Sequence, residues 1–453
     1  MTHYMRTLSS QAGHALAGVV ILVFVMAILG AGFMSLAGYE TRSTQQDLES
    51  QRAFWLAEAG KVRALRWMNH QTRPPENDVN IYQDATGPDG GTYTVECLVD
   101  TTSLYEVEKS FVLDCTGHSG NRDRRIRQRI RMTSFAQYAY FTDDELSAGG
   151  FPIWFVSTDA IEGPLHTNGT LRVLGSPRFL GEVTSASDHM LGYPNYWVDS
   201  PSDWPVGVNN PLFAEGFELN MPQVPLPTQT LDLRQEALTG GVYIGAQADL
   251  ELGVTGPVNP VPAPGWFRYR PTDPPGGNWT SVQITTLPGR VFYADGDLHV
   301  KGLLDGELTV ASSLNVRIED NLTYQASDAQ GAPLPGCDDL LGVVAGGNIV
   351  FVDNIPNGTD LLIDGVLMGL NTSITAENYG TRGYCGALTI WGGLIQKYRG
   401  AVGITNGNIV THGYRKDYHY DTRVTARTPP AFPLTGVYNE VAWTETWDAS
   451  YPF

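Results

Sequence analysis

The stretch that decides the fold is residues 15–37, ALAGVVILVFVMAILGAGFMSLA, continued at residues 40–69 by ETRSTQQDLESQRAFWLAEAGKVRALRWMN. The first stretch has no charged residue, and a helix of its length spans roughly 35 Å, enough to cross a bilayer. In the second, apolar residues recur every three or four positions between charges, as on an amphipathic helix. Together they predict one long helix, apolar in its first half and amphipathic in its second.

Three interpretations of the apolar stretch are open. It is an uncleaved single-pass anchor, a secretory signal peptide cut after the small residues 35–37, or a prepilin-type leader cut before the helix. The amphipathic continuation favours the third, because a signal peptide rarely runs into such a helix. Arg6 precedes the apolar stretch without any acidic residue, which predicts a cytoplasmic N-terminus and a large part outside the cytoplasm.

The N-terminal segment resembles PilX-like minor pilins of type IV pilus systems. The match rests on Ala12-Gly13-His14-Ala15-Leu16, the apolar stretch, Ala53-Phe54 and Ala57-Glu58-Ala59-Gly60. The resemblance implies cleavage between Gly13 and His14 by a prepilin peptidase. Gly18 then becomes the fifth mature residue. Most pilins have Glu at this position, whereas tip or accessory pilins lack that Glu, as this chain does. The resemblance implies helix packing against other pilin subunits through Gly18, Gly30, Gly32, Phe54 and Glu58.

Composition separates two parts of the chain. Hydrophobic residues make up 42% and charged residues 17%, which excludes a disordered chain. Residues 1–132 hold 14 basic and 14 acidic residues, whereas residues 133–453 hold 15 basic and 34 acidic residues and so carry the whole net charge of −19. This acidic part is a poor nucleic-acid binder.

We therefore expect an α+β chain. A leader (1–13) precedes the helix (14–70), a small pilin-like antiparallel sheet (71–134) and an acidic β-rich domain (135–453). Three alternating strands are expected in the small sheet, at 91–99, 105–115 and 124–132.

In the acidic part, a loose motif Gly-x-(Leu/Ile)-x-apolar or Thr recurs at irregular spacing. It occurs as Gly169–Val173, Gly296–Val300, Gly306–Val310, Gly347–Phe351, Gly386–Ile390 and Gly407–Thr411. Each copy predicts a short strand entered by a glycine turn, and such repeats indicate a β-helix or β-solenoid, with a β-sandwich as the alternative. The Pro-rich residues 193–288 are expected to be an insertion that lies over the β core.

Four strings in the acidic part resemble an uncharacterised β-rich family found behind pilin-like leaders in bacteria. They are GPLHTN at 163–168, GSPRF at 175–179, QKYRG at 396–400 and GYRKDYHYDTR at 413–423. This resemblance implies a surface-exposed, pilus-associated part and no known activity.

The four cysteines are candidates for disulfide bonds, and a run of arginines is a candidate interaction surface. In an exported chain, four cysteines predict two disulfides, and we favour Cys97–Cys115 and Cys337–Cys385 over free thiols.

A strand with one arginine face is expected at 124–132. Its side chains are solvated, docked on the acidic part of the chain, or available to an anionic partner. The arginines of this interaction patch are Arg125, Arg127, Arg129 and Arg131.

A catalytic site is not expected. A β-helix enzyme that cleaves polysaccharides needs a pair of side chains that act as acid and base. Two groups of residues are candidates for such a pair. The first is Asp295, Asp297 and Lys301, and the second is Lys416, Asp417, His419, Asp421 and Arg423. Neither forms a complete constellation, and no metal or cofactor motif is present.

The sequence therefore predicts a membrane-anchored, minor-pilin-like structural protein of the bacterial cell envelope, acting in pilus assembly priming or tip adhesion. Its expected partners are pilin subunits, the inner membrane and a surface glycan. The alternative is a membrane-anchored polysaccharide-binding or polysaccharide-degrading β-helix protein.

Overall fold

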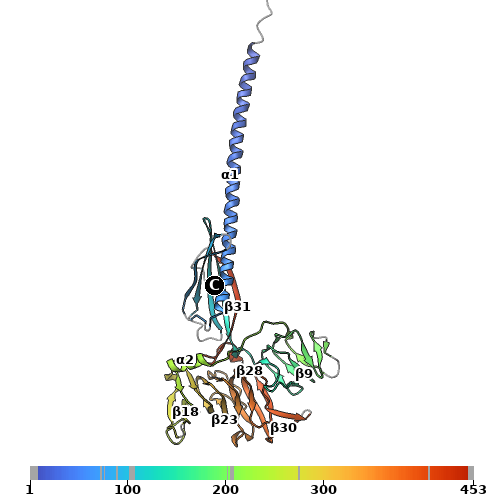
Figure 1. Cartoon of the computed structure of the whole chain (residues 1–453), viewed down its shortest axis with the longest axis vertical. Coiled ribbons are helices and arrows are strands. Elements are labelled where there is room, and N and C mark those ends of the chain that lie inside the picture. The colour runs from blue at the N-terminus through green and yellow to red at the C-terminus, as the bar shows by residue number, and fades with distance from the viewer. Residues whose placement is uncertain are drawn as a thin grey trace, which may run out of the picture. The chain divides into compact units, whose positions relative to one another are not determined.

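The computed structural model describes residues 9–71, 74–75, 77–87, 90–100, 108–200, 203–204, 209–273, 276–406 and 409–446 (Figure 1). The chain divides into two compact units. Unit 1 consists of residues 1–101, 110–130 and 439–453, and unit 2 of residues 102–109 and 131–438. The division falls between residues 130 and 131, and residues 439–446, which lie far along the chain, belong with the N-terminal unit.

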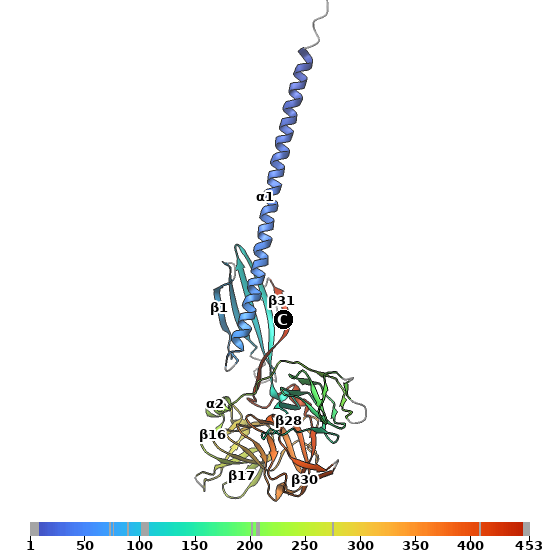
Figure 2. The same cartoon turned by 45° about the vertical axis from the view of Figure 1, so that its right-hand side comes forward.

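Unit 1 begins with the predicted long helix, α1, which is continuous from Ser9 to Met68 (Figures 1 and 2). Its first half carries large apolar side chains that are mostly exposed, for example Phe24 at 69% and Phe33 at 70%. By length and composition, α1 is the one helix of the described residues that is apolar enough to cross a membrane.

The second half of α1 packs on a sheet of five strands, in the order β1-β2-β3-β4-β31. The bounds are β1 (Val79–Thr86), β2 (Thr92–Val99), β3 (Glu108–Ser119), β4 (Arg122–Ser134) and β31 (Leu434–Thr446). The three expected strands correspond to β2, β3 and β4. β1 and β31 were not predicted, and β31 comes from the far end of the chain.

Small residues bring the helix close to the sheet. Ala53, Ala57 and Ala64 lie on one helix face and are fully buried. A Cβ added at Gly117 in β3 would lie 2.0 Å from the Ala53 carbonyl oxygen, so the helix backbone rests directly on that strand. The apolar half of α1 is therefore exposed, and we call it the free half. The amphipathic half packs on the sheet, and we call it the packed half.

Unit 2 is mainly β, and most of its strands pair in parallel. Ladder A is the longest run of these pairings. Its strands, in spatial order, are β16 (Val242–Ile244), β20 (Val291–Ala294), β22 (Glu307–Ser312), β24 (Leu340–Ala345), β26 (Leu361–Gly369), β28 (Tyr384–Tyr398), β5 (Tyr140–Asp144), β8 (Leu165–Thr167), β11 (Val183–Ser185) and β15 (Phe217–Glu218).

Two further ladders are each made of two separate runs. In ladder B, β17 (Ala248–Thr255), β21 (Leu298–Leu304), β23 (Val316–Tyr324), β25 (Ile349–Phe351) and β27 (Ile374–Ala376) form one run, and β6 (Phe155–Val156), β9 (Arg172–Leu174) and β12 (Met190–Gly192) form the other. In ladder C, parts of β21, β23, β26 and β28 lead to β30 (Ile409–His419), and β7 (Ala160–Ile161), β10 (Arg178–Phe179) and β14 (Leu212–Phe213) form the second run.

The chain builds this stack in two passes that meet at β28 and β5. The first pass starts at β5, and the second starts at β16 and returns to β28, where Leu394 lies opposite Tyr140. Ladder A crosses this meeting point, which we call the junction. Among the described residues, no strand pairing joins β30 to β7 there, so ladder C is interrupted.

The glycine-entered motifs supply inward-facing pairs in the ladders. Leu298 and Val300, Leu308 and Val310, and Ile349 and Phe351 are all fully buried, since alternate residues of a strand face the same side. The copies at 169–173 and 386–390 behave in the same way. The copy at 407–411 differs: residues 407–408 lie outside the described residues, and Ile409 is exposed.

The Pro-rich residues 193–288 are not an insertion over the core, which corrects that expectation. This segment supplies β15, β16 and β17 to the ladders at both ends of the stack, and α2 (Leu231–Gly240) lies in the connection between those ends. Hairpin partners complete the unit: β13 (Tyr196–Val198), β18 (Val261–Pro271), β19 (Thr280–Gln283) and β29 (Gly403–Asn406).

Candidate functional site

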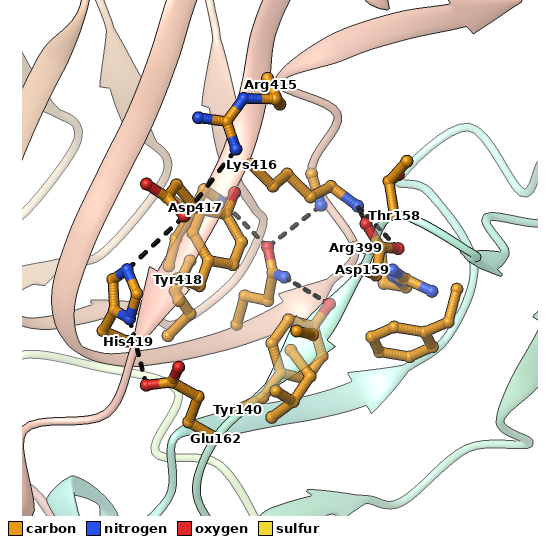
Figure 3. Close-up of a pocket in the computed structure, with 17 residues that line it drawn as sticks. Tyr140, Thr158, Asp159, Glu162, Arg399, Arg415, Lys416, Asp417, Tyr418 and His419 are labelled. Atoms are coloured by element: carbon orange, nitrogen blue, oxygen red, sulfur yellow. Dashed lines mark hydrogen bonds and ion pairs between the residues drawn. The ribbon is translucent and has the colours of Figure 1, made fainter. Parts of the chain in front are cut away.

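A pocket of about 140 Å³ lies at the junction, where ladder C is interrupted (Figure 3). We call it the junction pocket. Its walls come from β5, β28 and β30 and from the segment around β6 and β7, so it joins residues of the two passes. The aromatic rings of Tyr140, Phe155 and Tyr418 line it together with charged side chains.

Two ion pairs lie in or beside the pocket. Lys416 Nζ is 3.3 Å from each carboxylate oxygen of Asp159, which is 6% exposed. Arg399 Nη1 is 3.3 Å from Glu145 Oε2, and these side chains are 3% and 0% exposed. Burial lowers the pKa of Lys416. Buried charges are costly unless they are paired, so this network is a candidate for a functional role.

A histidine between two carboxylates forms the outer part of the pocket. His419 Nδ1 is 3.1 Å from Glu162, and Nε2 is 3.5 Å from Asp417. The ring stacks on Trp391 at 4.4 Å. Arg415 lies on the same face of β30, and its guanidinium is 3.9 Å from Asp417. These polar groups remain partly exposed.

The edge of β30 adds backbone groups to the pocket. The Tyr414 amide donates to Val402, on the side away from β28. Because backbone groups of a strand alternate between its two edges, those of Lys416 and Tyr418 face the same side. In the described residues, no strand pairs with this edge between 415 and 419.

The pocket therefore offers hydrogen-bond donors and acceptors in a charge-balanced setting. The cations among its lining residues are Arg399, Arg415 and Lys416, and the carboxylates are Asp159, Glu162 and Asp417. Among the residues that the structure describes, no group of three or more His, Cys, Asp or Glu side chains is arranged to hold a metal ion.

A second hollow, of about 440 Å³, lies elsewhere in unit 2 and is bordered by the segment 223–228. Asn168 forms part of its wall, where its amide nitrogen donates to Asp143 at 2.8 Å and to the Val224 carbonyl at 2.7 Å. These two bonds engage the Asn168 amide nitrogen within the chain itself.

The first acidic candidate, Asp295, Asp297 and Lys301, does not form one site. Asp295 accepts a hydrogen bond from the Tyr243 hydroxyl at 2.9 Å, and Lys301 pairs with Glu251 at 3.3 Å. Asp297 accepts from the backbone and side-chain amides of Asn315 at 3.1 and 2.9 Å. These residues hold turns and neighbouring strands in place.

The second acidic candidate is divided by the structure. Lys416, Asp417 and His419 meet in the junction pocket. Asp421 and Arg423 pair with each other at 2.6 Å, away from the pocket, where the Arg423 guanidinium lies 5.1 Å from the centre of the Tyr324 ring.

The expected disulfides are absent, because all four cysteines are free thiols. On β2 and β3, Cys97 lies opposite Leu113 and Cys115 opposite Val95, so the cysteines are diagonal neighbours. Diagonal Cα atoms stand roughly 7–8 Å apart, beyond the ~4.4–6.8 Å that a disulfide spans.

The second expected pair is held by other partners. The Cys337 thiol lies 3.6 Å from an oxygen of Asp339, and the Cys385 thiol donates to the Gly383 carbonyl at 3.2 Å. Two different local bonds therefore replace the expected bridge.

The expected residues of the anchor helix fall into two groups. Gly13 and His14 lie in the first turns of α1. A Cβ added at Gly18, Gly30 or Gly32 would meet nothing within 4 Å, so these glycines have no packing partner in the part of the chain that the structure describes.

Phe54 and Glu58 belong to the packed half of α1 and contact β31. The Phe54 ring lies 6.4 Å from that of Trp443, edge to face, and the Trp443 indole donates to Glu58 at 3.0 Å. The sequence could not place Trp443 there, because it lies 385 residues beyond Glu58.

The arginine strand is largely engaged within unit 1. Arg125 and Arg127 both pair with the buried Asp114 of β3, at 2.5 and 2.8 Å. Arg124 pairs with Glu445 of β31. The expected interaction patch is therefore docked in part on the chain's own carboxylates. Arg129 and Arg131 are half-buried on the same strand.

Sequence reasoning missed most of the junction pocket. Asp159, Glu162 and Arg399 were not singled out individually, although Arg399 lies within the string QKYRG. Asp159 and Lys416 are 257 residues apart, and no local pattern links them.

Comparisons with known proteins add a family match over a short segment. A model described as a domain of unknown function (DUF4900) matches residues 105–187, which include β4, β5 and the first short strands of unit 2. No curated protein matches the chain. The crystal structure of the competence-associated pilin ComZ from Thermus thermophilus is similar at 15% identity and a TM-score of 0.32, over 88% of this chain and 97% of that one. A TM-score of this size does not establish a common fold.

Proposed function

We propose that this chain is a membrane-anchored, minor-pilin-like subunit that presents unit 2 outside the cytoplasm. The observation that carries the proposal is the division of α1 into a free apolar half and a half packed on an antiparallel sheet. An exposed apolar surface of this length is costly in water and is stable in a bilayer or among similar helices.

The side chains of the free half support insertion rather than burial in a soluble core. Leu16, Ile21 and Met34 are 69%, 64% and 79% exposed. The glycines at 18, 30 and 32 leave shallow places on this surface where another helix can approach closely.

Processing at the start of α1 is the next part of the proposal. Cleavage between Gly13 and His14 removes a polar leader and leaves the apolar half at the new N-terminus. The mature subunit then enters a pilus or a priming complex through this half, as the resemblance to minor pilins implies. Gly18 carries no charge to pair with a neighbouring N-terminal amine, which fits a priming or tip position.

We further propose that unit 2 is a β-solenoid that serves adhesion by binding rather than catalysis. Three parallel ladders visited in turn by the chain support the solenoid. The pairing of Asp159 with Lys416, and of Glu162 with His419, supports binding, because each of these carboxylates already has a cationic or imidazole partner.

A charge placed in the free half tests the anchor. Leu22→Arg is expected to move the full chain from the membrane fraction to the soluble or degraded fraction, because an arginine at a helix centre costs about 2.5–3.5 kcal/mol of insertion. Ser43→Arg, in the charged region beyond the apolar stretch, is the matched control and keeps the membrane location. Equal membrane retention of both variants contradicts the proposed anchor.

A further inference from the structure

We propose that the junction pocket binds a neutral saccharide residue of about the size of a hexose. The proposal concerns unit 2 alone and does not depend on how α1 is anchored. It rests on three features of the pocket: the interrupted ladder, the balanced charges and the mixture of polar groups with aromatic walls.

The interrupted ladder leaves polar groups that a ligand can satisfy. At the junction, ladder A is paired through Leu394 and Tyr140, whereas the edge of β30 at Lys416 and Tyr418 has no paired strand in the described part of the chain. Backbone N–H and C=O groups in such a place need hydrogen-bond partners. An incoming hydroxyl group can serve both, because it donates and accepts.

An additional strand does not fit in this gap. The side chains of Lys416 and Asp159 meet across it at 3.3 Å, and those of His419 and Glu162 meet at 3.1 Å. The cavity of about 140 Å³ holds several waters, each of which takes ~30 Å³ in the liquid, and this suits a single sugar ring rather than a peptide.

The balance of charges favours a neutral ligand. An anion would approach Arg415 and Lys416 but would also meet Asp159, Asp417 and Glu162 at short range. A cation would meet the three basic side chains. Vicinal hydroxyl groups of a sugar donate to carboxylates and accept from guanidinium or ammonium groups, so they match both kinds of side chain at once.

The aromatic walls suit the apolar face of a sugar ring. Tyr140, Phe155 and Tyr418 line the same cavity as the charged groups. Figure 3 shows the two tyrosines beside those groups. Ligand sites commonly combine such apolar walls with a few convergent polar groups. Specificity is expected from the outer group of Asp417, His419 and Glu162, because these side chains are partly exposed and remain within reach of hydroxyl groups.

The test is calorimetric titration of the full chain in a zwitterionic detergent, since sugar-headed detergents would compete. The probes are methyl α-D-glucopyranoside, methyl β-D-galactopyranoside and N-acetyl-D-glucosamine, with D-galacturonate as the anionic comparison. At least one neutral probe is expected to bind saturably, with a Kd on the order of 1 mM for a ligand of this size. Galacturonate is expected to bind more weakly than that probe.

Variants connect binding to the pocket. Asp417→Ala and Glu162→Ala are each expected to weaken the neutral probe about tenfold, because a charge-assisted hydrogen bond is lost. Both side chains are 37–38% exposed, so the fold should persist, and thermal unfolding of each variant checks this. Glu215→Ala, which removes an exposed carboxylate of the same unit, is the matched control and leaves binding unchanged.

Three results would overturn the proposal. They are no saturable binding of any neutral probe, unchanged affinity in folded Asp417→Ala and Glu162→Ala, and tighter binding of galacturonate than of every neutral sugar.

Discussion

The free half of α1 and the ladders of unit 2 treat apolar side chains in opposite ways. Along α1, Phe24 and Phe33 are 69% and 70% exposed. In ladder A, Val310, Val343 and Leu367 are aligned on successive strands, and each is fully buried. Unit 2 thus covers its own apolar surface strand by strand, whereas α1 needs surroundings that this chain does not supply. The comparison places the helix stretch that is apolar enough to cross a membrane in unit 1.

The junction is one place where unit 2 buries charged side chains, and Arg399→Met tests how much the ion pair of Arg399 with Glu145 contributes to stability. Removing one partner of a buried ion pair costs about 3–5 kcal/mol, because Glu145 would stay buried without its cation. We expect a fall of that size in the free energy of unfolding of unit 2, measured by urea titration.

Two controls sharpen this prediction. Arg427→Met removes the exposed partner of Glu307 and is expected to cost less than about 1 kcal/mol. The double variant Glu145→Gln/Arg399→Met should recover much of the loss. If Arg399→Met lowers the free energy of unfolding no more than Arg427→Met does, the pair of Arg399 and Glu145 does not stabilise unit 2.

A buried carboxyl within the ladders, that of Asp364, allows the cost of burying a charge in unit 2 to be measured through the pH dependence of stability. Asp364 on β26 is fully buried and accepts a hydrogen bond from the Tyr324 amide at 2.8 Å. Burial raises its pKa to about 7. The folded state therefore holds this proton more tightly than the unfolded state, whose Asp pKa is about 3.9.

It follows that Asp364 favours the folded state at low pH and that this contribution is lost as pH rises from about 4 to about 7. The loss is at most about 4 kcal/mol by proton linkage. Asp364→Asn should flatten the decline in the free energy of unfolding across this window, whereas Glu215→Gln should leave it as in the parent chain. An identical pH dependence in Asp364→Asn and the parent would show that Asp364 is ionised in the folded state.

The packed half of α1 is tested by a smaller change, Gly117→Ala. The new methyl group would lie 2.0 Å from the Ala53 carbonyl oxygen, so helix and strand must separate. Overpacking of this kind costs about 1–3 kcal/mol, which differential scanning calorimetry should detect as a lower unfolding temperature of unit 1. Gly358→Ala, where a Cβ meets nothing within 4 Å, is the control and should change the temperature little. Equal effects of the two substitutions would mean that α1 is not seated on β3.

Local patterns account for what the sequence predicts well. The apolar stretch at 15–37 and the inward pairs such as Leu298 and Val300 are set by neighbouring residues, so helix and strand periodicity identifies them. The strands of the Pro-rich segment cannot be predicted from its sequence, because proline and glycine mark turns and the very short strands β15 and β16 between such turns carry almost no periodicity.

Pairings between distant segments could not be predicted from one sequence. β31 joins the N-terminal sheet, and β28 pairs with β5 across more than 240 residues, without any local signal in either strand. The junction pocket inherits this difficulty, because Asp159 and Lys416 meet only after the two passes of the chain are stacked. The disulfide between Cys97 and Cys115 is wrong for a different reason. The register of β2 and β3 offsets these cysteines by two residues, so that they are diagonal neighbours, and spacing along the chain does not reveal register.

The most direct test of the proposed pilin-like role is the mature N-terminus, measured by mass spectrometry on protein isolated from its own cell membranes and from sheared surface filaments. We expect a chain that begins at His14 in both samples, with the apolar half of α1 intact. A chain that begins at Gly38 has lost that half, and an intact Met1 shows that no processing occurs; either start contradicts the proposed pilin-like subunit.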